Sequence, residues 1–277
     1  MKRVLTIQDI SCFGKCSTTV ALPILSAMGV ETVILPTAVL STHTMFSGFT
    51  VKDLTDQMEP ICAHWKKENI RFDAIYTGYL GSEEEIDIVS RIFRDFGGED
   101  TLIFVDPVMA DNGKLYPAFD LHYAQRNAAL CGMADIIVPN ITEACVMTGT
   151  EYRETYDEAY IKLLLTRLTT LGAKKSFLTG VSLSEGKTGV YGMISATGET
   201  VIYQNDRVNA TYHGTGDIFS SAAVGALVQE RSLYEAFQIA ADYTADTIRE
   251  TLRDPREPWY GVNFETTLPL LVDRMRT

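Results

Sequence analysis

The sequence predicts a three-layer α/β protein in which a central, mostly parallel sheet has helices on both faces. Strands and helices alternate along most of the chain, and no repeat, low-complexity segment or linker interrupts them. Residues 4–7 form a β-branched strand, residues 18–28 an apolar helix that ends at Gly29, and residues 32–35 a second strand closed by Pro36. This opening strand–helix–strand unit is typical of a parallel sheet, and we expect residues 1–277 to form one domain.

The remaining elements follow the same alternation. Further strands are predicted at residues 73–77, 102–105, 136–138 and 176–179. Helices are predicted at residues 51–67, 83–96, 121–130, 141–147, 158–171, 215–229 and 233–252, with one more at the C-terminus. Residues 189–195 and 200–204 predict an antiparallel hairpin at the sheet edge, and residues 9–17 and 37–50 predict loops.

Composition limits the partners of the protein. The 277 residues are 46% apolar and 22% charged, which is ordinary for a soluble globular protein, and the formal charge is −12. An acidic chain is a poor partner for nucleic acid or an anionic membrane, but a local cradle of N–H groups can still bind phosphate. The first residues break too early for a secretory signal, and no apolar run approaches the length of a membrane span. We therefore expect a cytoplasmic protein that binds small molecules.

The cysteines predict free thiols. Their number is odd, none forms a C-x-x-C pair, and the four histidines show no ligand spacing with them. They are Cys12, Cys16, Cys62, Cys131 and Cys145.

The sequence Gly-Thr-Gly-Asp at residues 214–217 predicts an anion site. Glycine lets the backbone approach a ligand closely, and the start of the following helix offers free N–H groups and a positive dipole end. A carboxylate in this place suits a base that accepts a proton from an attacking hydroxyl, although Asp217 as a simple helix-capping residue is the structural alternative. Residues 9–16 and 180–188 lack the spacing of a phosphate-binding P-loop, and no G-x-G-x-x-G follows the first strand.

Polar side chains follow the ends of six predicted strands. In an open parallel sheet, ligands bind beyond the carboxyl ends of the strands, so these residues are candidates for one common site. Each of them alone is more often a cap or a turn residue. They are Asp9, His43, Thr44, Tyr79, Asp106, Asp111, Asn140, Glu143 and Thr179.

Several motifs together resemble the ribokinase superfamily. Residues 214–217 resemble its anion-hole and catalytic-base motif. Residues 106–108 (D-P-V) resemble a motif that follows a central strand there, and residues 139–144 (P-N-I-T-E-A) resemble its P-N-x-x-E-A segment. Within the superfamily, the chain is most similar to the pyridoxal (pyridoxine/pyridoxamine) kinases. The similar segments are V-L-T-I-Q at residues 4–8, S-T-H-T at 41–44, T-G-Y at 77–79 and D-P-V-M-A-D at 106–111.

This resemblance implies a ribokinase-like fold and ATP-dependent phosphorylation of the 5′-hydroxymethyl group of a vitamin B6 vitamer. It implies that Asp217 is the base and that Gly214 and Gly216 form the anion hole. The substrate would be bound by Asp9, His43, Thr44 and Tyr79. ATP would be bound by Asn140, Thr179 and Thr215, and Mg²⁺ by Asp106, Asp111 and Glu143. A monovalent cation such as K⁺ is a further expected cofactor, and members of the family are commonly homodimers.

One difference between this sequence and the family pattern leaves more than one substrate in question. Many members of the family have Ser where this chain has Asp9, which can pair with a substrate cation or cap the loop after the first strand. The hydroxymethylpyrimidine kinases also have an acid after their first strand, so they are the nearest alternative, and a non-catalytic B6-binding protein is a second. Residues 37–48 and 208–213 are candidate lids, while Lys187 and Arg207 are predicted to be solvated.

Overall fold

The computed structural model describes residues 1–256 and 258–276 and has the predicted three-layer α/β architecture. Within these residues the main sheet has nine strands in the order β11-β10-β9-β8-β5-β4-β1-β2-β3. The pairs from β2 through β1, β4, β5 and β8 to β9 are parallel, whereas β3, β10 and β11 join antiparallel at the two edges. The prediction of a mostly parallel sheet is confirmed.

The first strands are longer than predicted. β1 (Arg3–Ser11) continues through Asp9, so that this carboxylate lies within a strand, and β2 (Glu31–Leu40) continues through Pro36. The pairing of β1 with β2 is irregular just after Pro36, and β3 (Val51–Asp53) meets β2 only from Ala38 onward. Proline is tolerated at such irregular or outer positions because no regular ladder there requires its missing N–H. The predicted helix over residues 51–67 is therefore wrong in its first turn, which is β3.

The other parallel strands agree with their predicted positions within about two residues. They are β4 (Ala74–Thr77), β5 (Leu102–Val105), β8 (Ile136–Ile137) and β9 (Lys175–Val181). The predicted edge hairpin consists of β10 (Lys187–Ile194) and β11 (Thr200–Asp206).

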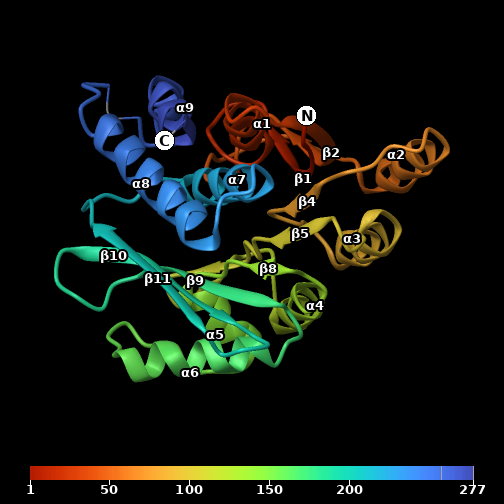
Figure 1. The fold of residues 1–277 in the computed structure, drawn as a ribbon. Coiled ribbons are helices and arrows are strands. Elements are labelled where there is room, and N and C mark those ends of the chain that lie inside the picture. The colour runs from red at the N-terminus through yellow and green to blue at the C-terminus, as the bar shows by residue number, and fades with distance from the viewer. Residues whose placement is uncertain (257, 277) are drawn as a thin grey trace.

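Two helical layers enclose this sheet. On one face lie α1 (Thr18–Ala27), α7 (Thr215–Val228), α8 (Leu233–Thr251) and α9 (Leu268–Arg276), with a short 3₁₀ turn at Phe264–Thr266 (Figure 1). On the other face lie α2 (Thr55–Lys67), α3 (Glu83–Phe96), α4 (Leu121–Cys131), α5 (Ile141–Thr148) and α6 (Glu158–Thr169). Each layer has its own core of buried aliphatic and aromatic side chains.

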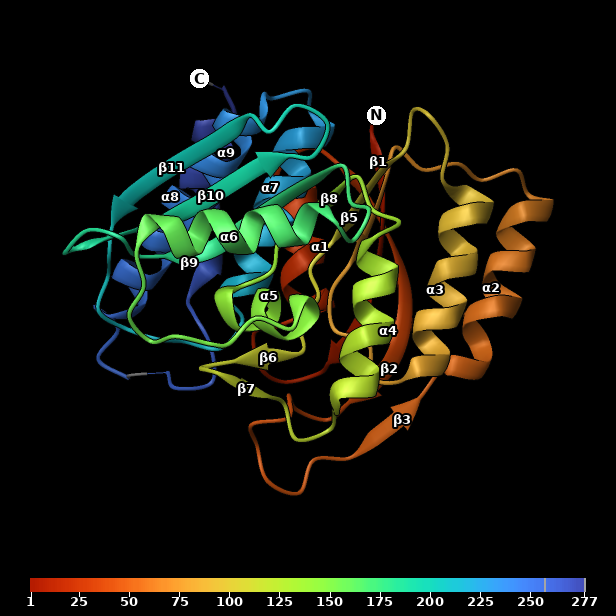
Figure 2. The ribbon, with the colours of Figure 1, turned by 90° about the horizontal axis from the view of Figure 1, so that it is seen from below.

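A second, two-stranded sheet was not predicted. β6 (Ala110–Asp111) and β7 (Lys114–Leu115) form a hairpin beside α5 (Figure 2). Its turn consists of Asn112 and Gly113, both with positive φ (50° and 77°), which is the combination that tight hairpins favour. The Asn-Gly pair is a signal from which the sequence would have predicted this hairpin.

Two further predictions agree with the structure. All five cysteines are free thiols. In the described part of the chain, no helix is both long and apolar enough to cross a membrane.

Candidate active site

A cavity of about 480 Å³ lies beyond the carboxyl ends of β5, β8 and β9, between these strands and the start of α7. Its lining brings together nine of the residues predicted from strand ends and from the glycine motif. They are Asp106, Asp111, Asn140, Glu143, Thr179, Gly214, Thr215, Gly216 and Asp217.

The glycine turn forms one wall of the cavity. Gly214 is the N-cap of α7 with φ 81° and ψ 0°, and a Cβ there would lie 1.9 Å from the carbonyl oxygen of Lys15, so both the conformation and the packing require glycine. At Gly216 a Cβ would meet only the Asp106 carboxylate, at 4.0 Å, so the missing side chain leaves open space. No side chain caps α7, and its first N–H groups have no partner within the helix. This wall therefore suits an anion.

Asp217 lies in the first turn of α7, in the wall of the same cavity. Burial raises its pKa to about 7, with Asp106 and Asp9 adding repulsion, while the backbone N–H of Ser17 donates a hydrogen bond that acts in the opposite direction. A carboxylate whose pKa lies near neutrality is suited to accept a proton from a hydroxyl group.

Asp106 and Glu143 are two buried carboxyl groups in the lining of the same cavity. Asp106 accepts a hydrogen bond from the Ser220 hydroxyl at 2.7 Å, and Glu143 accepts from the backbone N–H groups of Met109 (3.0 Å) and Asn140 (2.9 Å). Burial raises the pKa of both carboxyl groups, and the charge of Asp106 raises that of Glu143 further. Two buried carboxylates at one site favour a bound cation.

The donor set fits a magnesium ion. Oxygen ligands suit Mg²⁺, which commonly uses one or two protein carboxylates together with phosphate oxygens and water. Asp106 and Glu143 are such a pair, whereas Asp111 is exposed and accepts two hydrogen bonds from Asn112. Among the described residues no group of three or more potential ligands is close enough to hold a metal by itself, so phosphate would complete the coordination.

Asn140 and Thr179 lie side by side at this edge of the sheet. They form an isolated parallel bridge, in which the N–H of Thr179 donates to the Pro139 carbonyl at 3.0 Å. Asn140 also caps α5 reciprocally with Glu143 and donates through Nδ2 to the Ala110 carbonyl at 2.8 Å. Asn140 therefore fixes the segment that follows Asp106 against α5.

The four predicted substrate residues do not line this cavity. Asp9 is buried, which raises its pKa, and the half-buried Tyr79 lies near it. The His43 ring packs against His213 with centroids 4.3 Å apart and ring planes tilted by 44°, and His213 does line the cavity. His43 therefore contacts the cavity wall through His213 and lies near Asp9, whereas Thr44 is exposed.

Both ring nitrogens of His43 make hydrogen bonds. Its Nδ1 accepts from the N–H of Met45 at 3.3 Å, so Nε2 has the proton and donates to the Tyr260 carbonyl at 2.9 Å. Burial and the neighbouring His43 lower the pKa of His213 to about 4. At neutral pH His213 therefore adds no positive charge to the site.

Aromatic residues that the sequence did not identify enclose this second region. Phe13, Phe46, Trp259 and Tyr260 come from three segments, and their ring centroids lie between 4.5 and 6.4 Å apart where they touch. The adjacent Trp259 and Tyr260 after a proline are the signal that the sequence offered.

Of the two predicted lids, residues 208–213 contribute to the cavity wall, with Asn209 as the exception. The predicted solvation of Lys187 agrees with its exposed ion pair to Asp206 (2.7 Å). Arg207 is exposed but also lines the cavity.

Comparison with known proteins shows one family. The family model described as phosphomethylpyrimidine kinase matches residues 22–257. A hydroxymethylpyrimidine/phosphomethylpyrimidine kinase of Bacillus subtilis is 26% identical over 204 residues, which cover 73% of this chain and 71% of that protein.

Two solved structures are more similar. A candidate phosphomethylpyrimidine kinase from Bacteroides thetaiotaomicron, solved with pyridoxal, is 39% identical with a TM-score of 0.92 and covers 98% of this chain and 95% of its own. A pyridoxal kinase from Lactobacillus plantarum is 30% identical with a TM-score of 0.89, covering 99% of this chain and 97% of its own.

Proposed function

The chain belongs to the phosphomethylpyrimidine kinase family of the ribokinase-like superfamily, and on this premise we propose that it transfers a phosphoryl group from ATP to the 5′-hydroxymethyl group of a vitamin B6 vitamer. The observation that supports this most is the position of Asp217 in the first turn of α7, beside an open glycine turn and across from two buried carboxylates. A protein that only binds its ligand has no need of a carboxylate in an anion site.

The residues of the site have different roles in the reaction. Asp217 accepts the proton of the substrate hydroxyl as its oxygen bonds to the γ-phosphorus, and the bond between that phosphorus and the bridging oxygen of ADP breaks. The N–H groups at the start of α7 stabilise negative charge on the moving phosphoryl group. Asn140, Thr179 and Thr215 border the same cavity and hold the phosphates of ATP in line.

Asp106 and Glu143 would hold Mg²⁺, with Asp111 at the rim of the cavity. The ion supplies charge neutralisation for the phosphates. In its absence the pair places two carboxylates against the polyphosphate chain, so we also expect ATP binding to depend on Mg²⁺.

The choice of a B6 vitamer rests on the substrate side. His43, Thr44 and Tyr79 match the B6 branch of the resemblance, and the similar protein from Bacteroides thetaiotaomicron was solved with pyridoxal. A buried carboxylate at Asp9 pairs well with a protonated pyridine nitrogen or a substrate amine. The second candidate is a hydroxymethylpyrimidine kinase, which the matching family model and the acid at position 9 favour.

A substrate panel tests the proposal. ADP release is measured with Mg–ATP and, in turn, pyridoxal, pyridoxine, pyridoxamine and hydroxymethylpyrimidine, and each product is identified by mass spectrometry. We expect the highest kcat/KM for a B6 vitamer. Preference for the pyrimidine would support the second candidate, and ADP release with none of the four would contradict both. A homodimer and activation by K⁺ remain predictions from the resemblance, and a cytoplasmic location remains a prediction from the sequence.

A further inference from the structure

Tyr79 follows β4 and lies beside Asp9 of the neighbouring strand β1. The two strands pair in parallel with Ile7 opposite Thr77, so Asp9 and Tyr79 each follow this matched pair by two residues. Neighbouring strands lie about 5 Å apart. Burial raises the pKa of the Tyr79 hydroxyl, and the charge of Asp9 raises it further. A ligand that Asp9 binds is therefore within reach of Tyr79.

Tyr123 of α4 supports Tyr79 in two ways. Its hydroxyl donates to the carbonyl of Leu80, the residue after Tyr79, at 2.6 Å. Its ring stacks on Phe119, with centroids 3.9 Å apart and planes 8° apart, and Phe119 packs against the Tyr79 ring at 5.4 Å. The supporting side chains are buried, whereas Tyr79 is half-buried at the end of this stack. Tyr123 therefore acts on both the backbone after Tyr79 and the ring of Tyr79.

Glu85 of α3 holds the same segment one residue further on. Its carboxylate accepts from the N–H of Gly81 at 2.6 Å and from the hydroxyl of Thr55, the first residue of α2, at 3.2 Å. Glu143 and Glu235 occupy the same third helical position in α5 and α8, and each bonds the N–H of its own N-cap residue. Glu85 instead bonds the residue before its N-cap and is buried, and burial raises its pKa to about 7.

The side chains that hold this segment come from α2, α3 and α4, which lie side by side on one face of the sheet (Figure 2). A buried carboxyl group disfavours folding unless its oxygens are bonded, so the two bonds of Glu85 are needed where it lies. The backbone directly after Tyr79 is thus held at the Leu80 carbonyl and at the Gly81 N–H, with hydrogen bonds of 2.6 Å each.

We propose that Tyr123 and Glu85 are positioning residues, which hold Tyr79 in place beside Asp9 for the ring of the substrate. The proposal rests on the proposed function for the roles of Tyr79 and Asp9, but the contacts of Tyr123 and Glu85 exist independently of it. Neither of these two side chains belongs to the lining of the phosphate cavity. Their loss should therefore affect the substrate and not ATP.

Tyr123→Phe removes the hydroxyl and keeps the aromatic stack. We expect KM for the preferred substrate to rise roughly 3- to 10-fold, the effect of losing about one hydrogen bond, with kcat and KM for ATP little changed. The measurement is steady-state ADP release with each substrate varied in turn.

The matched control is Tyr160→Phe. Tyr160 in α6 is equally buried, and its hydroxyl donates to the Glu151 carbonyl at 2.6 Å, far from Tyr79 in the fold. Both variants should lose about 2–4 °C in Tm, because each removes one buried hydrogen bond. Only Tyr123→Phe should change KM for the substrate. A purely structural Tyr123 predicts a wild-type KM in both variants, and this result would overturn the proposal.

Two substitutions test Glu85. Glu85→Gln keeps an oxygen that accepts from Gly81 and an amide that can bond the Thr55 hydroxyl, whereas Glu85→Ala removes both contacts. We expect Glu85→Ala to raise KM for the substrate as Tyr123→Phe does, and Glu85→Gln to restore a nearly wild-type value. Equal KM values in the two Glu85 variants would contradict the positioning role of Glu85.

A measurement without turnover distinguishes this proposal from the proposed function. The ring signals of the tyrosines are recorded by ¹H–¹³C NMR, with Tyr79→Phe to assign those of Tyr79. Tyr123→Phe should shift the Tyr79 signals, because they depend on the distance and angle to the Phe119 ring, and Tyr160→Phe should not. Unchanged Tyr79 signals in Tyr123→Phe would overturn the inference even if the protein is a kinase. A shift would support it even if none of the four substrates is phosphorylated.

Discussion

At the residue scale, Asp217 has two properties that are in conflict. Its position beside the anion site suits a base, while its burial among other carboxylates disfavours the charge that a base needs. Residues tuned in this way are a common feature of active sites, and they lower the stability of the fold. Activity and stability should therefore respond in opposite directions when the carboxylate is removed.

Asp217→Asn should reduce kcat by roughly 10²–10⁴-fold, the usual contribution of a general base. ATP binding should be nearly unchanged, because the N–H groups of the glycine turn remain. The measurement is steady-state ADP release beside calorimetric titration with Mg–ATP, with the exposed Asp273→Asn as a control that keeps wild-type activity. Near wild-type turnover in Asp217→Asn would remove Asp217 from the mechanism.

The same variant should change how stability depends on pH. The pKa of Asp217 rises from an ordinary 3.8 to about 7 on folding, so between these values the folded state binds more protons than the unfolded state. Stability of the wild type should therefore fall as pH rises from about 4 to about 7. Asp217→Asn should show a smaller fall, and it should be more stable than the wild type at pH 8. Urea unfolding at pH 5 and pH 8 measures both differences; identical pH slopes would contradict the raised pKa.

A substitution of Asp9 should affect pyridoxamine and pyridoxal differently. If it pairs with a cationic group, Asp9→Ser should weaken pyridoxamine more than pyridoxal, because only the former has an amine as well as the ring nitrogen. The ratio of the two kcat/KM values, compared with the wild type, measures this. An equal loss for both vitamers would limit Asp9 to contacts within the protein, such as its bond to Ser11.

At the element scale, α5 shows how one sequence pattern serves two purposes. The N-x-x-E of residues 140–143 forms a capping box in which each side chain bonds the other's backbone N–H. The second oxygen of Glu143 holds Met109, and Nδ2 of Asn140 holds Ala110. The helix start therefore anchors the segment that follows Asp106. The roles of Asn140 in binding ATP and of Glu143 in binding Mg²⁺ remain predictions beside this structural one.

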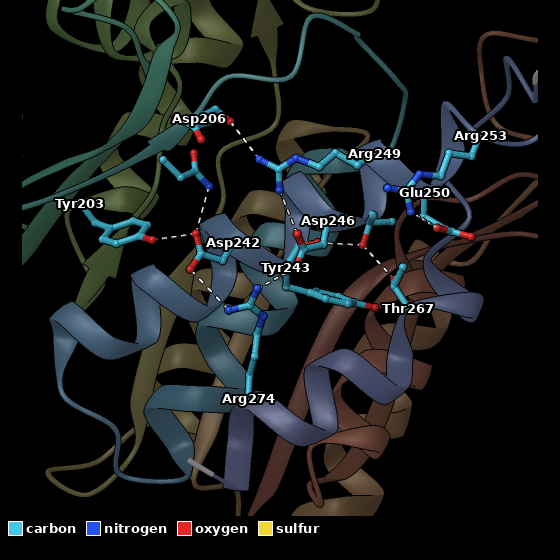
Figure 3. Close-up of polar contacts among 12 residues, drawn as sticks. Tyr203, Asp206, Asp242, Tyr243, Asp246, Arg249, Glu250, Arg253, Thr267 and Arg274 are labelled. Atoms are coloured by element: carbon cyan, nitrogen blue, oxygen red, sulfur yellow. Dashed lines mark hydrogen bonds and ion pairs between the residues drawn. The ribbon is translucent and has the colours of Figure 1, made fainter.

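Helix α8 is held on its outer face by a network of charged side chains (Figure 3). Asp242 accepts from Tyr203 of β11 at 2.7 Å and pairs with Arg274 of α9 at 3.4 Å, and Arg274 also pairs with Asp246 at 2.6 Å. The adjoining face of α8 borders the cavity with Ala241, Thr244, Ala245 and Ile248. The network thus fixes the helix that forms the outer cavity wall.

Arg274→Met should destabilise the protein by about 1–2 kcal/mol, because two partly buried carboxylates lose a common partner. The matched control is Arg276→Met, since Arg276 is exposed and pairs with Asp273 of the same helix at 3.5 Å. That control should change stability by less than about 0.5 kcal/mol. Denaturant unfolding of the two variants tests the difference, and equal values would show that the network adds nothing beyond surface pairing.

At the scale of the whole molecule, the cavity joins parts of the chain that are distant in sequence. Its lining comes from the segment after β5, from α5 and from β9 on one side and from β10, β11, α7 and α8 on the other. A ligand that contacts both sides should stabilise the protein as a unit, because it binds the folded state alone.

Mg–ATP at about 100 times its Kd should add about 2.7 kcal/mol of stability, or on the order of 5 °C in Tm. Removal of Mg²⁺ with EDTA should abolish most of this gain, because Asp106 and Glu143 would then repel the phosphates. Thermal unfolding with ATP alone, Mg²⁺ alone and both together tests this. A full shift with ATP and EDTA would contradict the assignment of these carboxylates to the metal.

Much of the fold was predictable because local chemistry and tertiary structure agree. Helix α3 was predicted with its observed bounds from its periodicity and the glycines that follow it, and the structure adds that Ser82 caps it and acidic residues fill its first turn. Local signals failed where long-range pairing prevails. Residues 51–53 fit the pattern of the predicted helix, but they form a strand that pairs with β2. Asp9 begins a polar stretch that predicts a loop, but it lies within β1. A strand needs a partner that the local sequence does not contain.

For the site, the sequence by itself determined the type of chemistry and one group of residues. Asp217 follows a glycine turn, and the other polar residues follow parallel strands. In any sheet of this topology such residues come close together, because the carboxyl ends of the strands lie at one edge. Only the tertiary structure decided that the ring of His43 packs against His213 at the cavity, and that Trp259 and Tyr260 contact His43 from another segment. Those contacts join residues far apart in the chain, and packing between elements determines them rather than any pattern along one element.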